Sequence, residues 1–143
     1  MARAGLNPRR LTLAGAELAD EVGFDQVTVS ALARRFDVKV ASLYSHVRNS
    51  HDLRTRIALL ALEELADRGA AALAGRAGKD ALTALANVYR DYAREHPGRY
   101  AAAGFRLDPA AAGVDHLIGV TDKAQTTVSL DFGKISINDS LML

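Results

Sequence analysis

Two short segments with regularly placed apolar residues, separated by Asp37, constrain the fold of this 143-residue chain more than any other feature. The first segment follows Thr28, whose hydroxyl is able to cap a helix. In the first segment Val29, Leu32, Ala33 and Phe36 recur at helical spacing, and the second segment carries the apolar residues Val38, Ala41 and Leu43. Asp37 is of a residue type that tolerates the left-handed backbone of a tight turn. The spacing therefore predicts a helix over 28–36, a short turn, and a second helix over 38–46.

Further helices are predicted on both sides of this pair. Pro8 begins a periodic segment that Gly23 ends, which predicts a helix over 8–22. Asn49, followed three residues later by Asp52, resembles a capping arrangement and predicts the start of a helix over 50–73. Beyond a Gly-containing break, the apolar period predicts a helix over 80–95 and a short one over 99–105.

A helix, a tight turn and a second helix, flanked by supporting helices, is an arrangement that presents a helix to DNA. Residues 1–56 carry nine Lys or Arg against six Asp or Glu, whereas residues 107–143 carry two against five. A basic N-terminal part suits phosphate binding, although a solvated helical surface would explain the charges alone. The helical pattern, rather than the charge, predicts DNA binding.

The segment 23–53 also carries a family resemblance, in the order GF, T-V, L-A, V, S-L-Y-S-H-V and D-L. It resembles the DNA-binding domain of the tetracycline-repressor (TetR) family, and the similarity extends over roughly residues 7–105. The stretch YAREHPGRY, residues 92–100, resembles the regulatory-domain entry of the WHG-type subgroup, although the W and H-G signature is absent. Asp37 stands where the family usually has Gly. The resemblance implies a repressor that binds a palindromic operator in double-stranded DNA as a homodimer and releases it when a small apolar effector enters its helical domain.

The candidate DNA contacts follow from placing the second helix of the motif in the major groove. Base edges are assigned to Lys39, Val40, Ala41 and Ser42, and the DNA backbone to Tyr44, His46 and Thr28, with Arg9 and Arg10 in a basic arm together with Arg3. Three alternatives stay open. Thr28 would also serve as a simple cap, Tyr44 as half-buried core, and the arm as a frayed terminus.

The expected fold is mainly α: a three-helix, helix-turn-helix head over residues 1–50 and a truncated helical regulatory domain over 51–113, followed by a short β-hairpin-like tail. The predicted helices over 50–73 and 80–95 offer a lining for an effector pocket, formed by Leu60, Leu82, Leu85, Tyr89 and Tyr92. Such an apolar stripe would equally be plain core.

The tail, residues 114–143, departs from the helical pattern. Its apolar and polar residues alternate at Val128, Leu130, Phe132, Ile135, Ile137, Leu141 and Leu143, which predicts two or three short strands. It resembles the switch-one and following strand region of bacterial Ras-like small GTPases, but no G-x-x-x-x-G-K-[ST] loop is present, so nucleotide binding is not expected. A junction of two reading frames near Gly113 would explain the change. The chain would then be either a working regulator or a remnant or interaction module that keeps the DNA head without the dimer helices.

Other classes of function find little support. The chain has no Cys, which excludes disulfides and thiolate metal sites. His46 and His51 lie five residues apart, a spacing that fits no metal pair on one helical face, and neither His96 nor His116 completes a catalytic constellation. We therefore expect no enzyme activity, cofactor or metal. The N-terminus shows no export pattern and the chain no membrane segment, which predicts a cytoplasmic protein.

Overall fold

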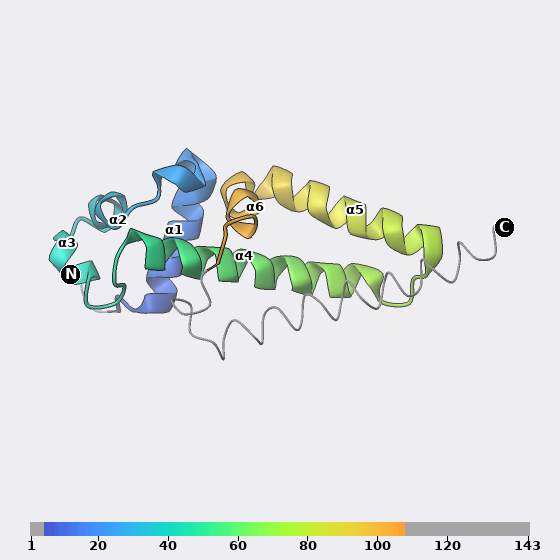
Figure 1. The fold of residues 1–143 in the computed structure, drawn as a ribbon, viewed down its shortest axis with the longest axis horizontal. Helices are drawn as coiled ribbons and strands as arrows, with labels where there is room; N and C mark the ends of the chain where they lie inside the picture. The colour runs from blue at the N-terminus through green and yellow to red at the C-terminus, as the bar shows by residue number, and fades with distance from the viewer. Residues whose placement is uncertain (1–4, 108–143) are drawn as a thin grey trace.

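The computed structural model describes residues 5–107, so the tail, residues 114–143 with its predicted strands, and Arg3 lie outside the described residues. The described part is built of helices and contains no strand: α1 (Pro8–Val22), the 3-10 helix η1 (Phe24–Gln26), α2 (Val29–Phe36), α3 (Val40–Leu43), α4 (Ser50–Leu73), α5 (Gly78–Glu95) and α6 (Pro97–Ala103). The helices α1 to α3 gather at one end, α4 runs away from them, and α5 returns alongside α4 (Figure 1). The predicted mainly α fold is confirmed.

Helix α1 has the predicted bounds because both of its ends are fixed locally. The Asn7 side chain accepts a hydrogen bond from the Arg10 amide at 2.8 Å, Pro8 occupies the first turn, and Gly23 leaves the helix at a φ of 100°. Only glycine adopts such a backbone without strain. The chain then turns through η1, which places Phe24 in the core at 7% exposure.

The turn between α2 and α3 is closed by the left-handed backbone of Asp37, as predicted, with φ 51° and ψ 48°. The amides of Asp37 and Val38 donate to the carbonyls of Arg34 and Ala33 at 3.2 and 3.0 Å, which ends α2. Helix α3 is therefore shorter than the predicted span 38–46. Val38 is used to close α2, and residues 44–46 form a turn in which the His46 amide donates to Leu43.

Helix α4 joins the head to the remaining helices and has the predicted bounds. The Asn49 side chain accepts from the Asp52 amide at 2.8 Å, and the Asp52 carboxylate accepts from the Arg48 amide at 3.0 Å, so both side chains fix the start of the helix. Its first turns bury Leu53 and Ile57 completely. A Cβ at Gly15 would lie 2.8 Å from Ile57 Cδ1, so a larger residue at position 15 would require the Ile57 side chain to move where α1 crosses α4.

The last two helices differ from the sequence prediction at their starts. Helix α5 begins at Gly78, two residues before the predicted start, and Arg76 pairs with Asp80 across its first turn at 3.0 Å. Helix α6 begins at Pro97 instead of Arg99 and ends at Ala103. The HPG sequence was interpreted only as the end of the preceding helix, whereas Pro also has the backbone angle that suits the first turn of a new helix.

Candidate nucleic-acid interface

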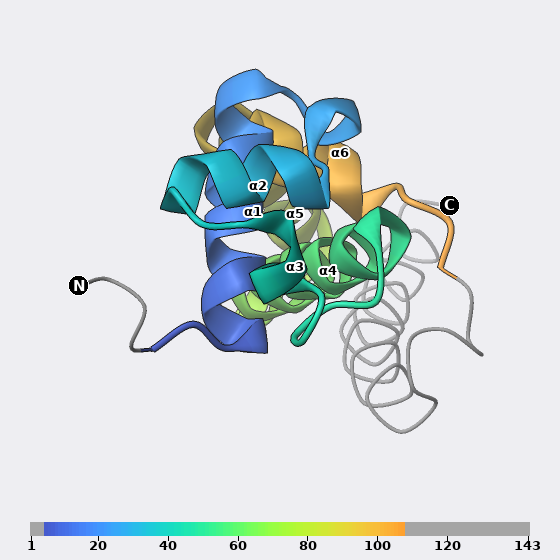
Figure 2. The same cartoon turned by 90° about the vertical axis from the view of Figure 1, so that its left-hand side faces the viewer.

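Helix α3 is packed on the core of the head by one side and exposed on the other. Leu43 is completely buried and Val47 is 2% exposed, so both side chains fix this short helix to the core of the head. On the outer side Lys39, Ala41 and Ser42 are exposed and Val40 is half-buried. Figure 2 views this end of the molecule, with α2 and α3 in front of α1 and α4. The four residues assigned to base edges thus share one short element at the surface, with no helix covering it in this view.

Tyr44 and His46 continue this surface. The Tyr44 side chain is 51% exposed, which disagrees with the alternative that it is half-buried core. His46 is half-buried and borders an open hollow of about 660 Å³ beside α3, whose other lining residues are Leu6, Asp37, Val38, Lys39 and Ser42. Of the assigned DNA contacts, Lys39, Ser42 and His46 therefore meet around one depression at the end of the head.

The start of α2 is held by two hydroxyl groups. Thr28 caps it, because its Oγ1 accepts from the Ala31 amide at 3.0 Å. The Val29 amide donates to Ser50 Oγ at 3.0 Å and so is engaged within the protein. The predicted phosphate contact at Thr28 would then use its hydroxyl proton, which the cap leaves available. Sequence reasoning missed Ser50 because its contact with α2 crosses 21 positions of the chain.

Several cations of the head are engaged within the protein. Arg35 pairs with Glu21 at 2.8 Å and Glu17 at 3.4 Å, and the hydrogen bond from Arg35 holds the pKa of Glu21 below its usual range. Arg54 donates to the carbonyls of Val27 and Asp25 at 3.1 and 3.0 Å. These guanidinium groups tie elements of the head together. They are therefore less available to DNA than the total charge of the head indicates.

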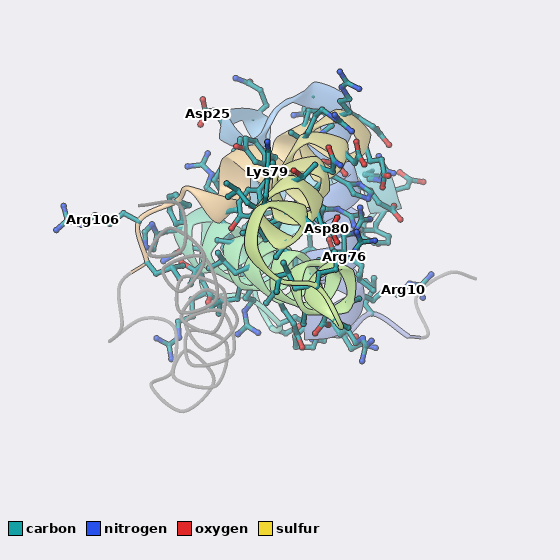
Figure 3. The ribbon with its side chains drawn as sticks, turned by 90° about the vertical axis from the view of Figure 1, so that its right-hand side faces the viewer. Arg10, Asp25, Arg76, Lys79, Asp80 and Arg106 are labelled. Atoms are coloured by element: carbon teal, nitrogen blue, oxygen red, sulfur yellow. The ribbon has the colours of Figure 1, made fainter. Side chains whose placement is uncertain are left out.

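Other cations of the head lie at its surface. Within residues 5–107, the exposed residues Arg9, Arg34, Lys39 and Arg48 have no recorded ion pair. Arg10 makes a hydrogen bond to the Gly5 carbonyl at 3.4 Å, and Figure 3 shows its side chain at the periphery of the molecule. Arg9 and Arg10, the predicted arm residues, sit in the first turn of a well-capped helix, so they belong neither to an arm ahead of the helix nor to a frayed end.

The five residues assigned to an effector pocket range from completely buried to exposed. Tyr92 is completely buried, and its hydroxyl donates to Glu64 at 2.8 Å. Leu60 is partly buried and packs against the core, whereas Leu82 and Tyr89 are 51% and 42% exposed. Leu85 is half-buried. A hollow of about 380 Å³ between the end of α1, η1 and α6 has none of the five in its lining, so the effector pocket stays a prediction.

The described residues offer neither a metal site nor a membrane-spanning helix. No group of three or more His, Cys, Asp or Glu side chains is arranged to hold a metal ion there. None of the described helices combines the length and the apolar composition that crossing a membrane requires.

Comparison with known proteins places the candidate interface in a family. Residues 11–53 match the model of the bacterial regulatory proteins of the tetR family. An uncharacterised HTH-type transcriptional regulator of Bacillus subtilis (strain 168), YobS, is 37% identical over 101 residues, which cover 71% of this chain and 53% of that protein. Another, Rv0681 of Mycobacterium tuberculosis (strain ATCC 25618 / H37Rv), is 40% identical over 83 residues, covering 58% of this chain and 38% of that protein.

The chain thus spans about half the length, or less, of the curated relatives it matches. The matched segment contains most of α1, all of α2 and α3, and the first turn of α4, which are the elements that build and anchor the exposed surface of α3. Residues 11–53 of this chain are therefore a helix-turn-helix domain of the TetR family of bacterial regulatory proteins.

Proposed function

We propose that the protein is a sequence-specific DNA-binding transcription regulator. The observation that carries the proposal is the outer side of α3, where Lys39, Ala41 and Ser42 are exposed above the buried Leu43. The names of both relatives describe them as HTH-type transcriptional regulators, which supports the same function for this chain. An enzymatic function has no comparable observation in its favour.

The proposed recognition divides the exposed residues into two groups. Near the start of α3, Lys39 and Ser42 donate to base edges, and Val40 and Ala41 contact thymine methyl groups. Around them, Tyr44, His46 and the Thr28 hydroxyl bind phosphates, and Arg9 and Arg10 follow the DNA backbone or the neighbouring minor groove. The phosphate contacts set the position of the head on the duplex, and the base contacts set its sequence preference.

The regulatory part of the proposal goes further. As a repressor, the protein would bind a palindromic operator with two heads related by two-fold symmetry, and a small apolar effector would lower its affinity. Residues 51–113 would belong to a helical regulatory domain of the WHG type, whose entry the segment 92–100 resembles. The alternative is an interaction module that keeps the DNA head but does not pair two heads and therefore does not repress.

Fluorescence anisotropy tests the proposal directly. The purified chain is titrated against a labelled duplex from immediately upstream of its own gene and against a scrambled duplex of equal composition, over a series of salt concentrations. We expect tighter binding to the upstream duplex and a loss of that preference in Lys39→Ala. Lys79→Ala is the matched control, because it removes the same charge at the opposite end of the molecule from α3 (Figures 1 and 3). Equal, salt-sensitive binding of both duplexes by the wild-type chain would contradict sequence-specific recognition.

A further inference from the structure

A partly buried polar cluster joins the last turn of α1 to the start of α6. The Asp20 carboxylate accepts a hydrogen bond from the Arg99 amide at 2.9 Å through one oxygen and lies 2.9 Å from His96 Nδ1 through the other. The Asp20 and His96 side chains are 16% and 24% exposed. The Asp20 side chain thus contacts both the backbone amide of Arg99 and the side chain of His96. At least 76 positions of the chain separate Asp20 from these two partners.

Arg99 extends the cluster to α4. Its Nη1 lies 3.0 Å from Glu64 Oε1, and its Nε lies 3.1 Å from the Asp20 carboxylate without hydrogen-bond geometry. The Arg99 side chain is 13% exposed. Glu64 also accepts from the buried Tyr92 hydroxyl at 2.8 Å. One guanidinium therefore lies between two carboxylates from two helices, and a tyrosine of α5 completes the group.

The backbones beside this cluster are in direct contact. A Cβ added to Gly98 would fall on the backbone of Ala19 and Asp20, so α6 reaches α1 only because this position is glycine. Such a close approach fixes the distance between the two helices, and the directional hydrogen bonds of Asp20 fix how α6 is turned on α1. The packing at Gly98 and the polar contacts of Asp20 thus hold the same contact between α1 and α6, which is called the α1–α6 joint below.

On the α1 side, the contact between α1 and α6 is continuous with the DNA head. Helix α1 is tied to α2 by the pairs of Arg35 with Glu17 and Glu21, and Leu11 of α1 belongs to the same buried cluster as Leu43 of α3. Because a close-packed interior transmits strain, a rotation of α1 relative to α6 would also act on α2 and α3.

We infer that Asp20 is a positioning residue, which through His96 and Arg99 holds α5 and α6 in one orientation relative to the DNA head. Removing its carboxylate would leave the partly buried donors of His96 and Arg99 without their partner, and the joint would occupy several orientations. The consequence for DNA affinity rests on the proposed function. The consequence for orientation does not.

Distance measurement between two spin labels tests the inference without DNA. Because the chain has no native Cys, Ser30→Cys on α2 and Ala86→Cys on α5 give two unique labelling sites, both exposed. We expect one narrow distance distribution in the parent chain, a broadened or displaced one in Asp20→Ala, and an intermediate one in Asp20→Asn, which keeps one acceptor for the Arg99 amide. Asp80→Asn is the control, because it removes a carboxylate whose exposed ion pair with Arg76 lies at the start of α5, away from Asp20, His96 and Arg99.

A merely structural role is separated by the same experiment. If Asp20 only added stability, Asp20→Ala would lower the Tm but leave the distance distribution unchanged well below that temperature, and this result would overturn the inference. In the DNA titration, Asp20→Ala should bind about fivefold or more weakly with an unchanged salt slope, because no phosphate contact is removed. If the wild-type chain showed no preference for any duplex, the proposed function would fail, whereas the distance distributions would still decide the role of Asp20.

Discussion

At the scale of single residues, Asp37 shows how the head forms a left-handed turn without glycine. It is the only described residue other than glycine with a positive φ, at 51°. Asp adopts this backbone more readily than most residues do, yet glycine adopts it without a Cβ penalty. The turn is thus formed correctly, at some cost in stability.

This cost gives a first prediction. Asp37→Gly should raise the free energy of unfolding by about 0.5 to 1 kcal/mol, and Asp37→Val should lower it by about 1 to 3 kcal/mol, because a β-branched residue is strained in this region. Urea unfolding followed by circular dichroism measures both variants. A stabilising Asp37→Val would show that the left-handed turn is not present in solution.

A second prediction concerns the hydroxyl of Ser50. Its Oγ accepts from the Val29 amide at 3.0 Å, so Ser50→Ala should leave that amide unpaired and destabilise the protein by about 1 to 2 kcal/mol. Ser45→Ala is the comparison, since that exposed hydroxyl donates only to the nearby Ser42 carbonyl. Equal stability of Ser50→Ala and the wild-type chain would remove Ser50 from the account of the α2 start.

At the scale of elements, the sequence predicted the helix ends that nearby residues fix, but not the features that depend on distant contacts. The ends of α1 and the start of α4 were predictable because Asn49, Gly23 and Pro8 act within a few positions of themselves. Helix α3 was predicted too long, since periodicity does not show that Val38 is used to close α2. The start of α6 at Pro97 was missed, and so was its contact with α1.

The candidate site divides in the same way. Ser42 and Leu43 of α3 and the preceding Lys39 lie within five positions of one another, so which of them face outward and which inward followed from the sequence. The role of Ser50 and the cluster around Asp20 did not, because their partners are separated from them by 21 and by 76 or more positions. Single-sequence periodicity carries no information on which distant polar groups meet.

A third prediction belongs to the contact between α1 and α6. Gly98→Ala should destabilise the protein by about 1 to 3 kcal/mol or more, because the added methyl would displace backbone atoms of Ala19 instead of a flexible side chain. Gly104→Ala is the control, since a Cβ there meets only the Ala101 carbonyl at an ordinary 3.6 Å. A Tm for Gly98→Ala equal to that of the wild-type chain would mean that the two helices are farther apart in solution.

At the scale of the whole molecule, the four helices α1, α4, α5 and α6 meet at a partly buried polar cluster that includes the buried Tyr92. Burial, followed by the hydrogen bond to Glu64, raises the pKa of the Tyr92 hydroxyl well above its usual range. The folded state therefore favours the neutral phenol more than the unfolded state does. The stability that Tyr92 contributes is fully present below its unfolded pKa of about 10 and is lost as the pH rises above that value.

The fourth prediction is the corresponding pH dependence. Tyr92→Phe should be less stable than the wild-type chain at neutral pH, because it loses the bond to Glu64, but its stability should fall less steeply above about pH 10. Urea unfolding across this pH range measures the effect, with Tyr100→Phe, at a 43% exposed position, as the control. Parallel pH curves for Tyr92→Phe and the wild-type chain would place Tyr92 outside the core.

The measurement that tests the central claim most directly is selection from a pool of random duplexes by the purified chain, followed by sequencing of the bound DNA. Recognition through α3 predicts one enriched motif, and Lys39→Ala should weaken or change it while Lys79→Ala leaves it intact. A two-fold symmetric motif would indicate paired heads, and a single half-site a lone head. Binding that enriches no motif and only weakens with salt would contradict sequence-specific recognition by this protein.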